Sequence, residues 1–230
     1  MTGEDRPPAL LHPGRYGWLL GVVALVVIAV VVVNGARTSG PGARGLAPGA
    51  RLPPFAAPLA TSAIRCDSPR DPCDANVATR ARQGSAGSRP ACEVRGPQIL
   101  NLCELTARGP VVLAFLATRG GDCAGELDRL DRVAARHPGV QVAAIGIRGD
   151  LGQLRGVVRT HRWHFPVGWD RDGILANLYG VAVCPDITYA RWGGRAQSTS
   201  LGTIGEQELD RRIEAAVAAS RRAGWSPPRA

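Results

Sequence analysis

Two cysteines in this sequence have the surroundings that thiol chemistry needs. Cys123 follows an apolar run at 111–117 and opens an amphipathic stretch, so we expect it at the N-terminus of a helix. Unpaired backbone N–H groups and the helix dipole at such a position lower the pKa of a thiol. Cys184 precedes Pro185, and a proline after a strand-like run is a candidate for a cis peptide bond. If these two segments belong to one site, its chemistry is that of thiols and disulfides.

The elements that would position these cysteines alternate along the chain. Buried strands are predicted by apolar runs at 111–118 and 140–147, and helices by periodicity at 123–137, 151–161, 172–179 and 206–221. Gly193-Gly194 separates two strand-like stretches, which is a hairpin signal. This order predicts an α/β domain with a central mixed sheet and helices on both faces.

Composition divides the 230 residues into six segments. We predict a cytoplasmic tail at 1–16, a transmembrane anchor at 17–34, a Gly/Pro-rich tether at 35–58, an irregular arm with cysteines at 59–96, the α/β domain at 97–221 and a C-terminal tail at 222–230.

The anchor is predicted from an almost uncharged run at 17–33. A membrane-spanning helix needs about 17–25 such residues. A cleaved signal peptide is the alternative, but no small-x-small cleavage site follows the run directly. Arginines on both sides of the run leave its orientation open, whereas six cysteines favour an oxidising compartment. We therefore expect a single-pass protein of the cell membrane with its C-terminal domain outside the cytoplasm.

Charge and metal-binding patterns narrow the classes of partner. The net charge is +9, but the arginines are scattered and form no basic stripe interleaved with aromatic residues, so we expect no nucleic-acid partner. His161 and His164 flank Trp163 with no cysteine nearby, and the chain has no Cys-x-x-Cys, so we expect no metal site and no cofactor. The pattern does not fix an oligomeric state.

Several spaced motifs carry a family resemblance. Residues 115–127 read Phe-Leu-Ala-Thr-Arg-Gly-Gly-Asp-Cys-Ala-Gly-Glu-Leu, and residues 179–185 read Tyr-Gly-Val-Ala-Val-Cys-Pro. With Phe-Pro-Val at 165–167 and Asp-Arg-Asp-Gly at 170–173, they make residues 97–217 similar to the membrane-tethered thioredoxin-like redoxins of the TlpA/ResA type, within the AhpC/TSA–thioredoxin superfamily. The resemblance implies a thioredoxin-like fold and thiol–disulfide redox activity.

The sequence departs from that family at the residues that matter most. Gly120 stands where the family has the first cysteine of its Cys-x-x-Cys motif, and Cys123 is the second. Leu116 and Arg119 replace the two tryptophans of the motif, and Ala114 holds the place of the buried aspartate of thioredoxins. A local Cys-x-x-Cys cycle, in which one thiol attacks and the other resolves, is therefore not open to this chain.

The fold implied by the resemblance suggests a replacement. It places the residue before the cis-proline opposite the helix end, so Cys123 and Cys184 would form a non-local redox pair, with Cys123 as the reactive thiol and Cys184 as its partner. Glu126, at i+3 from Cys123, would be the auxiliary acid or base, and Pro185 would align protein thiols or disulfides as substrates. The alternative is a structural Cys123–Cys184 bond in a catalytically inactive binding module.

A peroxiredoxin-like peroxidase is a second alternative. Cys123 would then be the peroxidatic thiol, with Thr118 and Arg119 as the residues that hold the peroxide. Against this, Thr118 lies five positions before the cysteine, and no proline precedes it in the spacing of that family.

The other four cysteines are predicted to be structural. Proximity in sequence favours a Cys66–Cys73 bond that closes a small loop, and a Cys92–Cys103 bond that pins the preceding segment to the sheet.

Overall fold

The computed structural model describes residues 17–37, 44–64, 73–118, 123–147 and 149–228. The chain divides into two compact units, Met1–Ser39 and Gly40–Ala230. The first contains one helix, α1 (Gly17–Arg37). Among the residues that the structure describes, no helix combines the length and the apolar character needed to cross a membrane. The anchor predicted at 17–34 is therefore not confirmed.

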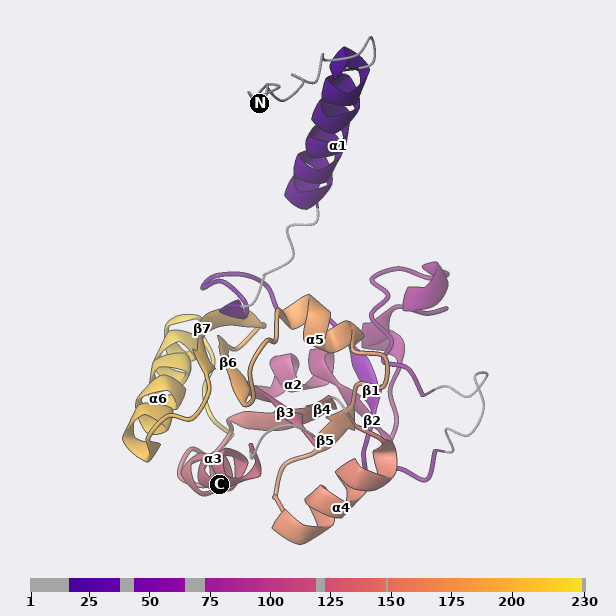
Figure 1. Cartoon of the computed structure of the whole chain (residues 1–230). Helices are drawn as coiled ribbons and strands as arrows, with labels where there is room; N and C mark the ends of the chain where they lie inside the picture. Colours follow the sequence, from indigo (N-terminus) through magenta and orange to yellow (C-terminus); the bar gives the residue numbers. More distant parts are fainter. Residues whose placement is uncertain (1–16, 38–43, 65–72, 119–122, 148, 229–230) are drawn as a thin grey trace, which may run out of the picture. The chain divides into compact units, whose positions relative to one another are not determined.

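A five-stranded mixed sheet forms the centre of the second unit (Figure 1). Its strands are, in spatial order, β5 (Val167–Trp169), β4 (Gln141–Ile147), β3 (Val111–Ala117), β6 (Asp186–Arg191) and β7 (Arg195–Leu201). β3, β4 and β5 run parallel, whereas β6 is antiparallel to β3 and to β7. The central strand β3 reads as a continuous apolar run because helices cover both of its faces.

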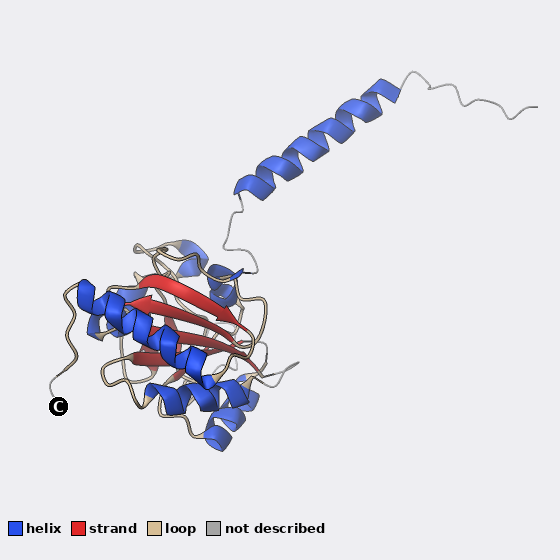
Figure 2. Ribbon diagram, turned by 90° about the vertical axis from the view of Figure 1, so that its left-hand side faces the viewer, coloured by secondary structure: helices blue, strands red, loops and turns tan. Residues whose placement is uncertain are grey.

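Helices pack on both faces of this sheet (Figure 2). One face carries α3 (Ala124–Ala134), α4 (Leu151–His161) and α6 (Glu206–Arg222), and the other carries α2 (Leu102–Arg108) and α5 (Ile174–Tyr179). In α3 the buried apolar residues are Leu127, Leu130 and Val133, whose spacing of three places them on one side of the helix. The predicted α/β class, with a mixed sheet between two helical layers, is confirmed.

The tether predicted at 35–58 is wrong for the part of it that the structure describes. Residues 44–60, which we call the leading segment, pack onto the domain, and Phe55 is fully buried. At one edge of the sheet, the segment pairs with β7 through the Arg51–Arg195 bridge; at the other, Leu59 bridges to Gly168 of β5. Between them, β1 (Ala56–Pro58) pairs antiparallel with β2 (Ile99–Asn101). The glycines and prolines of the leading segment therefore belong to an ordered stretch of chain.

The arm at 59–96 has little regular structure, with two short 3-10 turns, η2 (Gly84–Ala86) and η3 (Ala91–Glu93). It is nevertheless anchored, because Cys73, Ala78 and Ala91 are fully buried. The segment predicted as a C-terminal tail is also tied down. Trp225 is buried, and its Nε1 donates a hydrogen bond to the Arg108 carbonyl at 3.0 Å.

Candidate functional site

A disulfide joins Cys123 and Cys184. Cys123 is the residue directly before α3, and Cys184 lies two residues before the start of β6, the strand that pairs with β3. Their Cα atoms are 5.7 Å apart, within the range usual for disulfides. The peptide bond between Cys184 and Pro185 is cis. The structure thus brings together the non-local pair that the family resemblance implies.

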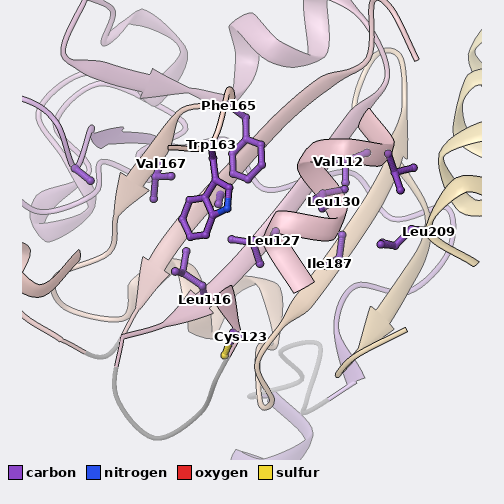
Figure 3. Close-up of a cluster of buried hydrophobic side chains, with 14 of the residues drawn as sticks. Val112, Leu116, Cys123, Leu127, Leu130, Trp163, Phe165, Val167, Ile187 and Leu209 are labelled. Atoms are coloured by element: carbon purple, nitrogen blue, oxygen red, sulfur yellow. The ribbon is translucent and has the colours of Figure 1, made fainter. Parts of the chain in front are cut away.

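The two half-cystines have different surroundings. Cys123 is only 1% exposed and belongs to the apolar core, at the end of the cluster that contains Leu116 and Leu127 (Figure 3). Cys184 is partly exposed and follows Val183, a large apolar residue that is 44% exposed. Solvent and a protein substrate therefore have better access to Cys184.

Each sulfur also lies next to backbone that favours a negative charge. Cys123 occupies the N-cap position of an eleven-residue helix and makes no side-chain capping hydrogen bond. The first N–H groups of a helix have no partner inside the helix and interact favourably with a thiolate. The backbone N–H of Ala117 donates a hydrogen bond of 3.0 Å to Cys184 Sγ. Both positions can therefore stabilise a thiolate once the disulfide opens.

Glu126, predicted as the auxiliary acid or base, has a different set of contacts. Its side chain is buried and forms an ion pair with Arg129, and its other oxygen accepts a hydrogen bond from the Ile204 N–H at 3.1 Å. Arg129 in turn donates to the Ile204 carbonyl at 3.0 Å. These contacts fasten the first turn of α3 to the loop before α6. Glu126 is thus explained as a structural carboxylate, and the predicted acid–base role gains no support.

A carboxyl group that the sequence argument did not single out lies beside the disulfide. Asp186 follows Pro185 and is fully buried, and within the described part of the chain neither of its side-chain oxygens has a hydrogen-bond partner. Burial raises its pKa to about 7. The sequence does contain a feature that could have pointed to Asp186, which is a charged residue in a strand-like run directly after a Cys-Pro pair. The polar–apolar alternation of that run, however, is typical of a strand with one solvated face.

Asp170 provides a contrast to Asp186. It too is buried, and desolvation raises its pKa to about 6. Its oxygens, however, accept hydrogen bonds from the N–H groups of Leu175 and Ala176 at the start of α5, at 3.2 and 2.9 Å. The carboxylate of Asp170 therefore has a structural explanation that Asp186 lacks.

The remaining predicted residues are placed as follows. Cys92 and Cys103 form a disulfide with Cα atoms 5.4 Å apart, which links η3 to α2. Cys73 is also disulfide-bonded, whereas its predicted partner Cys66 lies outside the described residues. Thr118 directly follows β3, and Arg119 lies outside the described residues. In the described ranges, no group of three His, Cys, Asp or Glu side chains is arranged to hold a metal ion.

The sheet order, the helical layers and the disulfide beside a cis-proline define a thioredoxin-like domain. A candidate thiol:disulfide interchange protein DsbE from Chlorobium tepidum has a TM-score of 0.55 and 19% identity, over 75% of this chain and 99% of that chain. The thioredoxin domain of a thiol-disulfide oxidoreductase from Bacteroides vulgatus gives 0.51 and 12%, over 75% and 99%. A secreted Mycobacterium tuberculosis disulfide oxidoreductase homologous to E. coli DsbE is 26% identical over 51% of this chain and 89% of that chain, with a TM-score of 0.47.

The similarities to the Chlorobium tepidum and Bacteroides vulgatus structures support the predicted resemblance at the level of the fold. No family model matches the sequence, and no curated protein matches it. The activity must therefore be argued from the site itself.

Proposed function

We propose that this domain is an extracytoplasmic thiol–disulfide exchange protein that works through the Cys123–Cys184 pair. The observation that carries the proposal is the asymmetry of this disulfide. Cys184 is a partly exposed residue that follows an apolar surface residue, whereas Cys123 is buried at a helix N-terminus. A thiol–disulfide exchange needs an accessible sulfur to be attacked and a leaving sulfur that is stable as a thiolate.

The asymmetry assigns different roles to the two cysteines. A substrate thiolate attacks Cys184 Sγ, the Cys123–Cys184 bond breaks, and its electron pair stays on Cys123 as a thiolate at the start of α3. This order reverses the prediction that Cys123 is the attacking or attacked thiol, because Cys123 is 1% exposed.

A second step completes the exchange. Another substrate thiol, after losing its proton to solvent, attacks the substrate sulfur of the mixed disulfide. Cys184 leaves as a thiolate beside the Ala117 N–H. The substrate departs as a disulfide, and two electrons have reduced Cys123 and Cys184. The reverse sequence transfers electrons to a substrate disulfide.

Protein thiols are the proposed substrates because Cys184 is partly exposed and follows the exposed apolar residue Val183, which a protein partner could contact. Attack by a peroxide on Cys123 is disfavoured by the same burial, so the peroxidase alternative has no observation in its favour. The location outside the cytoplasm is supported by disulfides, Cys92–Cys103 and Cys123–Cys184 among them, because such bonds persist in oxidising compartments. Attachment to a membrane through residues 17–34 stays a prediction, which alkaline carbonate extraction of cell membranes would test.

The deciding experiment measures the reduction potential of each bond in the same molecule. The protein is equilibrated in thiol buffers of stepped potential, alkylated, and mapped by mass spectrometry. We expect Cys123–Cys184 to open at a higher potential than Cys92–Cys103, which serves as the internal reference. Structural bonds of secreted proteins usually lie below about −300 mV. If both bonds opened together below that value, the pair would be structural, and the binding-module alternative would stand.

A further inference from the structure

The buried carboxyl of Asp186 has no structural role among the described residues. Its exposed fraction is zero, and both oxygens lack a hydrogen-bond partner. Burying such a group without a partner costs free energy, so natural proteins seldom keep one without a reason. Asp170, whose oxygens accept two backbone N–H bonds, shows how the same chain satisfies a buried carboxylate elsewhere.

Alternation along β6 fixes the face on which Asp186 lies. Ile187 and Tyr189 belong to the core under α3 and α6, so Asp186 and Thr188 point to the opposite face. Thr188 confirms this assignment, because its hydroxyl lies 3.4 Å from that of Thr199, which donates to the Leu46 carbonyl of the leading segment. Asp186 thus lies on the side of the sheet that α5 and the leading segment cover.

The described elements around Asp186 supply no charge that could compensate its own. β3 presents Phe115 on this face, and α5 presents Tyr179, whose hydroxyl donates to the Pro53 carbonyl and whose pKa burial raises well above its usual value. The leading segment has the exposed Arg44 at its start. The ionisable groups described on the opposite face, around Tyr189, include Glu126, Glu208 and Arg212. An ionised Asp186 would therefore be an isolated negative charge in an apolar setting.

Asp186 is also close to the sulfur of Cys184. It pairs with Phe115 in the β3–β6 ladder and is separated from Cys184 only by Pro185. The Phe115 carbonyl oxygen lies 4.0 Å from Cys184 Sγ. The Asp186 backbone and the Cys184 sulfur are thus both next to Phe115, near the end of β3 where the disulfide lies.

We infer that Asp186 couples proton uptake to the opening of the Cys123–Cys184 disulfide, by opposing a negative charge on Cys184. This inference rests on the exchange proposed above. Asp186 and Cys184 are separated by one residue, and two negative charges so placed next to apolar protein disfavour each other, so the protein favours one charge over two. Since the pKa of this carboxyl is about 7, its charge changes near neutral pH. Asp186 acts on the charge of Cys184 and does not itself touch the substrate.

The proton balance of the step follows. Each substrate thiol loses one proton to solvent when it attacks, and the two electrons pass to the cysteines. As Cys184 leaves with its electron pair, Asp186 takes up one proton from solvent if it was ionised. The carboxyl releases that proton when the disulfide forms again.

The test uses the full chain with Cys123→Ser, which leaves Cys184 as a thiol while the structural disulfides remain closed. The pH dependence of iodoacetamide alkylation at Cys184, read by mass spectrometry, gives the pKa of this thiol with and without Asp186→Asn. We expect Asp186→Asn to lower the thiol pKa by about half a unit or more, because the opposing charge is removed. Asp170→Asn, the matched control from the other end of the sheet order, should leave the thiol pKa unchanged.

A thiol pKa that is equal in the two chains, or that shifts as much with Asp170→Asn, would overturn the inference. A second measurement needs no substitution at Asp186 and so does not depend on the variant folding. Carboxyl NMR of the wild type should give a higher Asp186 pKa in the reduced than in the oxidised protein, and equal values would also overturn it. Neither readout requires turnover, so an inert disulfide would defeat the proposed function without deciding this inference.

Discussion

The backbone N–H of Ala117 donates a hydrogen bond to Cys184 Sγ at 3.0 Å, so the last residue of β3 directly contacts the accessible half of the disulfide. Hydrogen bonds from backbone N–H groups favour the charged form of an acceptor. Asp186, two residues after Cys184, acts in the opposite direction. The charge on this sulfur is thus set by a donor on β3 and a carboxyl on β6.

Single-cysteine variants should differ in their rate of mixed-disulfide formation. Cys123→Ser leaves the accessible Cys184, and Cys184→Ser leaves Cys123, which is 1% exposed. We expect Cys123→Ser to react with an aromatic disulfide reagent roughly tenfold faster or more, since access limits the buried thiol. Stopped-flow absorbance gives both rates, and the denatured variants supply the reference. Faster reaction of the Cys184→Ser variant would reverse the assigned roles.

The stability of the oxidised protein should depend on pH through Asp186. Its pKa is about 7 in the folded chain and about 3.9 in an unfolded one, so the folded state binds the extra proton between these values. Stability should therefore fall as pH rises from about 4 to 7. Asp186→Asn removes this part of the dependence and should gain up to about 4 kcal/mol relative to wild type between pH 4 and pH 8, at about 1.36 kcal/mol per pKa unit.

Urea unfolding at several pH values measures that difference, and only its change with pH is diagnostic. Asp170→Asn is the comparison, because Asp170 accepts two backbone hydrogen bonds that the amide only partly replaces. We expect this variant to be less stable than wild type at pH 8. A wild-type stability curve parallel to that of Asp186→Asn would show that Asp186 does not titrate in this range.

Glu126→Gln separates a structural role from a catalytic one. The amide keeps an acceptor for the Ile204 N–H but loses the charge that pairs with Arg129, so we expect a loss of about 1–3 kcal/mol of stability. The pH dependence of exchange at Cys184 should not change. Glu208→Gln, which breaks a partly exposed ion pair with Arg211 and Arg212, should cost less stability than Glu126→Gln. A changed pH profile in Glu126→Gln would restore the acid–base role.

Trp225→Ala tests whether residues after α6 belong to the folded domain. Trp225 is 7% exposed, and its indole bonds to the Arg108 carbonyl. Removing a buried Trp side chain typically costs about 3–5 kcal/mol, which thermal unfolding would record. Wild-type stability in this variant would mean that the segment is the loose tail expected from its sequence.

Much of the domain followed from periodicity, and the exceptions have physical causes. The helix at Leu151–His161 and the strand at Arg195–Leu201 match the predicted ranges, because apolar spacing and turn residues mark their ends. The leading segment was missed since Leu46, Leu52 and Phe55 are isolated among glycines and prolines, and each becomes buried only through contacts distant in sequence. The amino-acid composition of a segment does not reveal contacts with residues distant in sequence.

The functional site, too, could be predicted only in part from the sequence. The Cys123–Cys184 pairing was implied by a family resemblance, whereas the reversal of roles depends on exposure, which spacing does not reveal. Asp186 was missed because Asp-Ile-Thr-Tyr alternates as in a strand with a solvated face. In the structure β6 lies between β3 and β7 with both faces covered, so the polar positions 186 and 188 are buried too.

The path of the leading segment affects how readily copies of this protein can associate through their sheet edges. Unpaired strand edges are templates on which a second chain can add by backbone hydrogen bonding. Here the Ala196 N–H donates to the Ala50 carbonyl at the β7 side, and the Ala60 N–H donates to the Val167 carbonyl at the β5 side, so one stretch of chain covers part of both margins. A version shortened to begin after residue 60 would expose the two margins together, and we expect it to assemble into β-linked aggregates while the full chain remains dispersed.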